Sequence, residues 1–308
     1  EAAGAIILGK TNMHELAFGI TSANAHFGAV GNAYDASRSA GGSSGGTGAA
    51  VAAHLAPGGL GTDTGGSVRI PAAFNGIAGL RPTVGRYPTA GVVPISHTRD
   101  TPGPIARTVD DLVLLDGAIT GGATELDPVA LDGVRLGVAE AFTGGLSKEV
   151  QGVWDAAVAK LEAAGATLVP VEMPDVMALN EQIGFPVALY EVARDLPAFL
   201  DAWKAGASLQ DVADGVASPD VKFVFDNFVG GDKQMPEAAY AAAIGVLRPQ
   251  LQTLYAETFA DNHLDALVFP TTILAAPPKE GSGETVDLDG TQVPTFQTYI
   301  RNTDPGSN

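Results

Sequence analysis

Two glycine-rich tracts constrain the fold of this chain more than any other feature. They read Gly41-Gly42-Ser43-Ser44-Gly45-Gly46-Thr47-Gly48 and Gly61-Thr62-Asp63-Thr64-Gly65-Gly66-Ser67-Val68-Arg69. Glycine loses the most conformational entropy on folding, so two such tracts that also hold serines need a reason. Flexible linkers often have this composition, but apolar residues such as Val51, Leu60 and Ile70 surround the tracts. A linker is therefore not expected.

Three other interpretations remain for the tracts. Close packing of backbone against backbone is one. Phosphate binding is another, but residues 41–48 contain neither Gly-Lys-Ser/Thr nor Gly-x-Gly-x-x-Gly. The third is a nucleophilic serine beside converging backbone N–H groups, and Gly65-Gly66-Ser67 suits it. Such a serine also needs a base to take its proton.

A nucleophile elbow would be a rival arrangement for the same chemistry. Gly41 to Gly45 matches Gly-x-Ser-x-Gly, the elbow of the α/β-hydrolases. That fold also requires a downstream acid followed by a histidine. His263 is the only plausible histidine for this role.

Charge and composition exclude several classes of function. The chain has 308 residues, a net charge of −18 and no cysteine. The charge argues against a nucleic-acid surface, and the absence of cysteine removes disulfides, thiolate zinc sites and cysteine nucleophiles. No apolar run is long enough to span a membrane, and a cytoplasmic location is expected. His14, Glu15 and His26 are too isolated to predict a metal site, so neither a metal nor a cofactor is expected.

Hydrophobic periodicity predicts an α/β protein. Thr108 is the expected N-cap of one helix, and a strand–helix–strand unit should follow it, with its two strands parallel. No linker marks a domain boundary. The expected elements are strands at 5–10, 134–138, 166–171 and 264–269, helices at 49–56, 108–119 and 148–164, loops with short strands at 57–104, and a mostly helical region at 176–260.

Both ends of the chain have the composition of interrupted elements. Residues 1–5 repeat the Glu-Ala-Ala-Gly-Ala of residues 162–166, where a helix is expected to end at Gly165. By analogy, residues 1–4 are expected to be the last turn of a helix. Residues 301–308 are turn formers with no closing element. The sequence therefore predicts that a longer protein extends beyond both ends.

The two tracts and their neighbours closely resemble the amidase signature family. The resemblance is dense over residues 9–111, where it includes Gly9-Lys10-Thr11-Asn12-Met13 and Gly79-Leu80-Arg81-Pro82-Thr83, and it returns at 264–308. It implies a single amidase domain over residues 1–308, truncated at both ends. The implied fold is α/β, with a large mixed central β-sheet covered by helices on both faces and a helical, substrate-side region at about 176–260.

The resemblance also implies a Ser–cis-Ser–Lys triad. Ser67 corresponds to the nucleophile, and Ser43, after a cis Gly42–Ser43 bond, corresponds to the serine that relays a proton. The backbone N–H groups of Thr64, Gly65, Gly66 and Ser67 would form the oxyanion hole. Asp63 and Arg69 would pair to brace the loop, with Ser44 as a supporting hydrogen bonder.

The lysine of the triad has no match in this chain. Lys10 is the only lysine before the first tract, and its Gly-Lys-Thr-Asn context resembles a later segment of the family. We therefore do not assign Lys10 as the base. The lysine is expected upstream of residue 1, and the 308-residue chain alone is expected to be inactive.

Residues near the C-terminus indicate the substrate class. Residues 269–272, 293–296 and 300–308 look like the mandelamide and indoleacetamide hydrolases of the family. This implies hydrolysis of an arylacetamide to the carboxylic acid and ammonia through an acyl-serine, without a metal or organic cofactor. The aromatic residues that could line an aryl pocket or simply fill the core are Phe185, Tyr190, Phe223 and Phe225.

Two alternative functions stay open at this point. One is the amidase subunit of a tRNA-dependent amidotransferase, which would need partner subunits and a tRNA-facing assembly. The other is a non-catalytic binding protein on an amidase scaffold. For the enzyme, the expected partner is a small-molecule amide, with a homodimer as one assembly compatible with the sequence.

Overall fold

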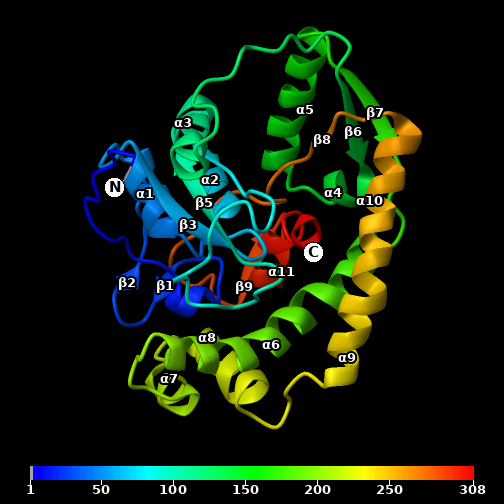
Figure 1. The fold of residues 1–308 in the computed structure, drawn as a ribbon. Coiled ribbons are helices and arrows are strands. Elements are labelled where there is room, and N and C mark those ends of the chain that lie inside the picture. The colour runs from blue at the N-terminus through cyan, green and yellow to red at the C-terminus, as the bar shows by residue number, and fades with distance from the viewer. Residues whose placement is uncertain (1–2) are drawn as a thin grey trace.

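The computed structural model describes residues 3–308, in which helices surround two three-stranded sheets (Figure 1). One sheet is antiparallel with the order β3-β5-β4, and the other is parallel with the order β7-β6-β8. Two short hairpins, β1-β2 and β10-β9, lie outside them. The strands are β1 (Ala23–Asn24), β2 (Gly28–Ala29), β3 (Gly58–Asp63), β4 (Ala78–Gly79), β5 (Thr101–Ala106), β6 (Arg135–Ala139), β7 (Thr167–Val171), β8 (Ala266–Leu267), β9 (Thr285–Leu288) and β10 (Thr291–Pro294).

The helices concentrate in the second half of the chain. The α-helices are α1 (Gly45–Ala52), α2 (Arg69–Phe74), α3 (Val109–Thr120), α4 (Glu140–Thr143), α5 (Lys148–Ala163), α6 (Val176–Ala202), α7 (Leu209–Gly215), α8 (Pro219–Val224), α9 (Glu237–Ala242), α10 (Arg248–Asn262) and α11 (Thr295–Ile300). Short 3₁₀ or π segments are η1 (Glu15–Ala17), η2 (Phe225–Val229), η3 (Ala243–Leu247) and η4 (Pro305–Ser307). No helix within residues 3–308 is long and apolar enough to cross a lipid bilayer.

The strand–helix–strand unit is confirmed. Strands β6 and β7 pair in parallel, with Arg135 opposite Thr167. Between them, α5 begins after Ser147, whose Oγ accepts from the Val150 N–H at 3.3 Å. Gly165, with φ of +98°, ends the helix as expected, because glycine adopts positive φ without steric cost. Thr108 likewise caps α3.

The α/β class is confirmed, but the strands divide differently from the single large sheet expected. Hydrogen bonds join the strands of residues 3–308 into separate sheets. At the outer edge of β3, side-chain hydroxyls take the place of a neighbouring strand. Ser44 Oγ accepts from the Thr62 N–H at 3.3 Å, and Thr47 Oγ1 donates to the Leu60 carbonyl oxygen at 3.2 Å. These bonds satisfy edge groups that would otherwise be free to pair with another strand.

Three other expected elements need correction. Residues 5–10 form no strand; Ile6 is 84% exposed, because nothing in residues 3–308 packs on this apolar run. The helix expected at 49–56 begins earlier, at Gly45, and ends at Ala52. The strand expected at 264–269 contracts to the two residues of β8. The helical turn expected at residues 1–4 falls partly on residues 1–2, outside the described residues.

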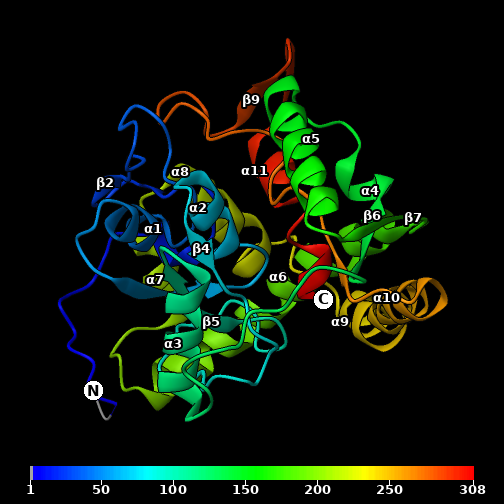
Figure 2. The same ribbon diagram turned by 90° about the horizontal axis from the view of Figure 1, so that it is seen from above.

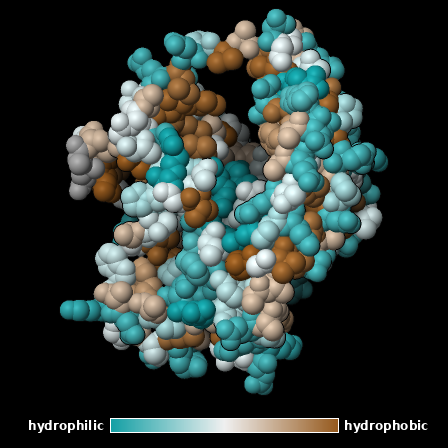
Figure 3. Space-filling view, turned by 45° about the vertical axis from the view of Figure 1, so that its right-hand side comes forward, coloured by the Kyte–Doolittle hydropathy of each residue, from teal (hydrophilic) through white to brown (hydrophobic). Residues whose placement is uncertain are grey.

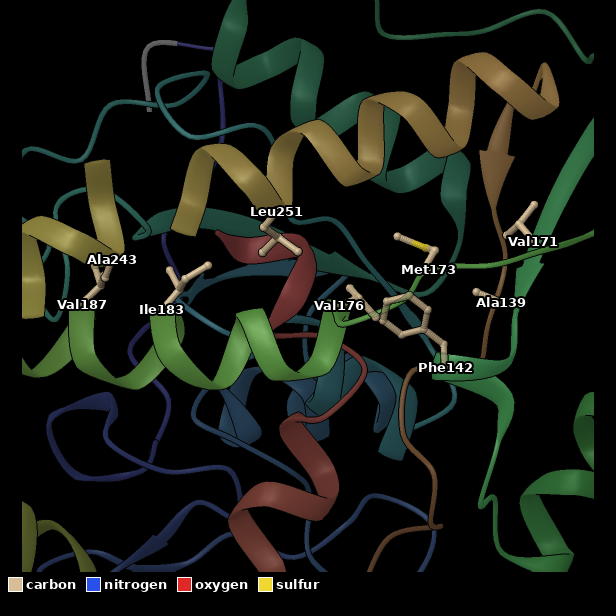
Figure 4. Close-up of a cluster of buried hydrophobic side chains, with 9 residues drawn as sticks. All are labelled: Ala139, Phe142, Val171, Met173, Val176, Ile183, Val187, Ala243 and Leu251. Carbon is tan, nitrogen blue, oxygen red and sulfur yellow. The ribbon is translucent and has the colours of Figure 1, made fainter. Parts of the chain in front are cut away.

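The largest core cluster lies where α6, α10, β6 and β7 meet (Figure 4). Leu251 of α10 points toward Ile183 of α6, and both are 0% exposed. Burying a side chain of this size stabilises the fold by about 1.5–3 kcal/mol. The cluster packs against one face of α6, and another face of this helix lines a cavity.

The C-terminal segment lies between the two sheets, and both ribbon views agree on this (Figures 1 and 2). Residues 302–305 and 307 of this segment are buried. The space-filling view shows a hollow in the upper half of the molecule, with apolar side chains gathered on one side of it (Figure 3). Residues far apart in the sequence therefore meet in the interior.

Candidate active site

The second glycine tract forms a tight connection between β3 and α2. Asp63 is the last residue of the strand and Arg69 the first of the helix. Within residues 3–308, the backbone N–H groups of Gly65, Gly66 and Ser67 donate to no other group. Together with Thr64, Gly65 and Ser67 line a cavity of about 870 Å³. The connection can therefore present hydrogen-bond donors and a serine hydroxyl to a small molecule.

The expected Asp63–Arg69 pair is present and braces this connection. Arg69 donates through Nη2 to Asp63 Oδ1 at 2.8 Å and through Nε to Oδ2 at 3.0 Å. The Val68 N–H donates to the same Oδ2 at 3.1 Å. Burial raises the pKa of Asp63, but the charges of Arg69 and Arg81 outweigh it and bring that pKa down to about 2. The carboxylate is thus fully ionised and holds both ends of the turn.

The first glycine tract brings Ser43 alongside. The Gly42–Ser43 peptide bond is cis, as the family resemblance implies. The Ser43 side chain is 0% exposed, and its Oγ has no hydrogen-bond partner among residues 3–308. The Ser44 N–H donates to the Ser67 carbonyl oxygen at 3.2 Å, which joins the two serine segments directly. A buried hydroxyl without a partner is costly, so Ser43 has capacity for a further polar group.

Close packing explains the glycines that follow Ser43. A Cβ on Gly45 would collide with Ser22, and one on Gly46 with the Asn12 backbone. In the second tract, a Cβ on Gly65 would meet Asp304 and one on Gly66 would meet Thr303. The packing interpretation is therefore correct for these positions, and it coexists with the presentation of Ser67.

The C-terminal segment supports the turn from the other side. Thr303 Oγ1 donates to the Gly65 carbonyl oxygen at 2.6 Å. Arg69 donates to the Thr303 carbonyl oxygen and to Ser307 Oγ, each at 2.8 Å. The orientation of the glycine turn thus depends on residues more than 230 positions away in the sequence.

Two further arginines that sequence reasoning missed join this network. Arg81 donates to the Asp63 carbonyl oxygen and, at 2.9 Å, to the Arg99 carbonyl oxygen. Arg99 donates to the Gly184 carbonyl oxygen of α6 and forms an ion pair with Asp304. Arg81, Arg99 and Asp304 all lie in stretches used for the family resemblance, but nothing in their spacing pairs them.

Thr64 is held by a buried carboxyl group. Its Oγ1 donates to Asp100, which also accepts from the N–H groups of Ile95 at 2.8 Å and Ser96 at 2.9 Å. Burial raises the pKa of Asp100 above its usual value. These bonds fix the loop before β5 against the start of the glycine turn.

Aromatic side chains form much of the cavity wall. Phe185 of α6 packs edge-to-face on Phe296 at 5.8 Å, and Phe223 packs on Phe228 at 6.0 Å between ring centroids. All four rings line the cavity. Of the aromatic candidates from the sequence, Phe185 and Phe223 are thus at the cavity. The other two are not among its lining residues: Phe225 is buried in a core cluster and Tyr190 stacks on Tyr240.

No lysine of the chain lies in a buried position in the structure. Lys10 is exposed, in agreement with its not being assigned as the base. His263 is exposed at the end of α10 and is not among the residues that line the cavity, so the α/β-hydrolase arrangement is wrong.

The histidines and acids weighed as metal ligands have other contacts. His26 Nε2 lies 3.5 Å from Glu15 Oε1, and Glu15 accepts from the Ser218 N–H at 2.6 Å. A different group, His97, Glu191 and Asp195, has the closely spaced ligand atoms that a metal requires. Its central carboxylate, Glu191, already accepts hydrogen bonds from Ser96, Thr98 and Tyr240.

The chain is similar to known proteins over nearly its whole length. Residues 1–307 match the family model described as Amidase. The chain is 43% identical to a mandelamide hydrolase of Pseudomonas putida, over 99% of the chain and 61% of that protein. It is 44% identical to an indoleacetamide hydrolase of Rhizobium radiobacter, over 100% of the chain and 66% of that protein. The chain thus spans less than two thirds of the length of these relatives.

A solved structure agrees with the sequence comparisons. A crystal structure described as an amidase superposes with a TM-score of 0.83 at 34% identity. The superposition covers 99% of this chain and 65% of that one. The amidase fold expected from the sequence resemblance is therefore confirmed, with the strands of residues 3–308 divided among separate sheets.

Proposed function

The chain belongs to the amidase family, and on that premise we propose that it carries the nucleophilic centre of an enzyme that hydrolyses a carboxamide. Ser67 Oγ attacks the amide carbonyl carbon, and the resulting oxyanion accepts hydrogen bonds from backbone N–H groups of residues 64–67. The C–N bond then breaks, and the nitrogen leaves as ammonia after gaining a proton. Water hydrolyses the acyl-serine to release the carboxylic acid and restore Ser67.

One observation carries this proposal. Ser67 lines the large cavity beside backbone N–H groups, and the hydroxyl of Ser43 is buried. Within the described residues 3–308, neither these N–H groups nor that hydroxyl has a hydrogen-bond partner. In this proposal Ser43 passes the proton from Ser67 to a base and later returns it to the leaving nitrogen. Asp63, Arg69 and Ser44 are positioning residues. Their bonds go to the backbone, to each other and to the side chains of Arg81 and Ser307.

The base that Ser43 requires is not evident among these residues. A neutral lysine needs a desolvated site to lower its pKa, and none of the chain's lysines occupies one. We therefore propose that the lysine of the triad comes from outside these 308 residues. The chain by itself is then expected to hydrolyse amides very slowly or not at all.

An arylacetamide is the proposed substrate. The relatives described above are named for mandelamide and indoleacetamide, which are both aryl-substituted acetamides. The phenylalanine-lined wall of the cavity is suited to an aromatic ring, because offset and edge-to-face contacts stabilise aromatic pairs. The amidotransferase and the non-catalytic binding protein are not favoured, since both relatives are named as hydrolases.

Three further expectations are part of this proposal. Residues 1–308 would form one amidase domain, and the hydrogen bonds between residues 303–307 and the turn after β3 support this. A homodimer and a cytoplasmic location stay predictions from the sequence.

The test is an assay of the full-length protein with arylacetamides, aliphatic amides and glutamine. Arylacetamides should give the highest kcat/KM. Ser67→Ala should lower kcat by roughly 10³-fold or more with an unchanged circular dichroism spectrum. The matched control is Ser37→Ala, at an exposed serine outside the cavity. Unchanged turnover in Ser67→Ala would exclude Ser67 as the nucleophile.

A further inference from the structure

A buried histidine in the cavity wall has polar capacity that the proposed chemistry does not use. His14 is 1% exposed and lines the same cavity as Ser67. Its Nε2 lies 2.9 Å from Asp220 Oδ2, and this contact contributes to lowering the pKa of Asp220. His14 Nδ1 has no hydrogen-bond partner among residues 3–308. Buried polar atoms of this kind are rare unless something else binds them.

The position of His14 is fixed by the proposed catalytic centre. Its backbone N–H donates to the Ser43 carbonyl oxygen at 3.0 Å. Its ring occupies the space where a Cβ on Gly19 would lie, and Gly19 also lines the cavity. The imidazole is thus held at a defined place in the wall that contains Ser67.

Asp220 lies beside His14 although it is far from it in the sequence. It lies in the first turn of α8, three residues before Phe223, so both side chains share one face of that helix. Asp220 and Phe223 line the cavity together. Burial opposes ionisation of Asp220, but its contact with His14 contributes to lowering the pKa. A charged acceptor therefore stands beside the aromatic wall.

The junction between these two segments is well supported. Glu15, next to His14, accepts from the Ala217 N–H at 3.1 Å and the Ser218 N–H at 2.6 Å. Ser218 Oγ accepts from the Ala25 N–H at 3.1 Å. These bonds hold α8 against the loop without Asp220. Asp220 Oδ1 accepts from the Val221 N–H at 3.0 Å, and the half-exposed carboxylate keeps lone pairs for a ligand.

We propose that His14 and Asp220 form a polar subsite that binds a hydrogen-bond donor, an O–H or N–H group, on the acyl part of the substrate. The proposal rests on the amidase function above and deepens it. The aromatic ring packs on the phenylalanine wall, while the donor bonds to the Asp220 carboxylate. Substrates without a donor forgo the hydrogen bond to the Asp220 carboxylate, and this lost bond is the basis for discrimination.

Paired substrates test the subsite in the full-length protein. Mandelamide is compared with phenylacetamide, which lacks the hydroxyl. Indole-3-acetamide is compared with 1-methylindole-3-acetamide, in which a methyl group replaces the hydrogen of the ring nitrogen. For each pair the selectivity is the ratio of the two kcat/KM values. For at least one pair, wild type should favour the donor-bearing member by about tenfold or more. Asp220→Ala should bring that ratio down to about one.

The matched control is Asp226→Ala, which removes the same charge from a neighbouring turn. Asp226 is 50% exposed against 51% for Asp220, pairs with Lys222 and is not among the residues that line the cavity. It should leave the ratio at the wild-type value. A ratio that survives Asp220→Ala, or a wild type without preference in either pair, overturns the subsite.

Binding measurements separate this proposal from the proposed function. Dissociation constants of the four amides are measured with Ser67→Ala and with Ser67→Ala combined with Asp220→Ala. The same loss of preference in binding is expected. If wild type hydrolyses none of the amides, the proposed function fails, and the binding ratios still decide the subsite. Equal ratios with and without Asp220 overturn it.

Discussion

Thr303 Oγ1 donates a hydrogen bond to the carbonyl oxygen of Gly65 across 238 residues of sequence, at 2.6 Å. Both groups are buried, and Gly65 belongs to the turn that presents Ser67 to the cavity. The orientation of the turn therefore depends on a segment at the other end of the chain.

Replacing Thr303 by valine tests this dependence. Valine keeps the shape but leaves the Gly65 carbonyl oxygen without that donor, which should destabilise the fold by about 1–3 kcal/mol. Because the turn would also lose its orientation, kcat should fall roughly tenfold with little change in KM. Steady-state kinetics of the full-length protein and urea unfolding measure both effects.

Thr298→Val is the control for this change. Thr298 is buried, and its Oγ1 donates to the Pro294 carbonyl oxygen at 2.6 Å, away from the glycine turn. It should lose stability to a similar degree and keep kcat. An equal loss of kcat in the two variants would mean that stability alone explains the effect.

Asp63 should make stability depend on acidic pH. Its pKa is about 2 in the folded protein against an ordinary value of 3.8, so the unfolded chain takes up a proton first as pH falls. The contribution is fully present above pH 4 and disappears as pH falls through 2. It amounts to about 2 kcal/mol.

The comparison with Asp63→Asn isolates this contribution. The substitution leaves Arg69 and Arg81 without their carboxylate, which should cost about 3–5 kcal/mol at neutral pH. The difference in unfolding free energy between wild type and variant should narrow by about 2 kcal/mol from pH 5 to pH 2. Urea unfolding across this range measures it, and a constant difference would refute the role of the Asp63 carboxylate.

Phe223 and Phe225 are two residues apart, but substituting one should change KM and substituting the other should change stability. Phe223 is 57% exposed and lines the cavity, whereas Phe225 is 0% exposed in a core cluster. Phe225→Ala should cost about 3–5 kcal/mol of stability. Phe223→Ala should instead raise KM for arylacetamides by about 3–10-fold, with little change in melting temperature. Equal effects on KM would place the aryl pocket elsewhere.

The source of the base can be tested by comparing the 308-residue chain with the full-length protein. If the lysine lies outside these residues, the shorter chain should give no detectable arylacetamide hydrolysis. Thermal unfolding of the shorter chain checks that it is folded. A folded 308-residue chain with the kcat/KM of the full-length protein would contradict the proposal.

The local elements were largely predictable because their signals are local. Thr108 and Ser147 cap helices through bonds to N–H groups three residues ahead, and Gly165 ends a helix by its own positive φ. The strand predicted at residues 5–10 is wrong because the burial of an apolar strand depends on partners that are distant in the sequence. The strand predicted at residues 264–269 is longer than the observed β8 for the same reason.

The sequence by itself determined the two serine tracts and, through their resemblance to a family, predicted Ser43 and Ser67 as the reactive groups. Tertiary structure alone decided what surrounds them. Thr303 supports the turn, Arg99 joins α6 to Asp304, and His14 meets Asp220 in the cavity wall. Motifs record short-range backbone requirements, whereas these contacts arise from packing between segments that the sequence keeps far apart.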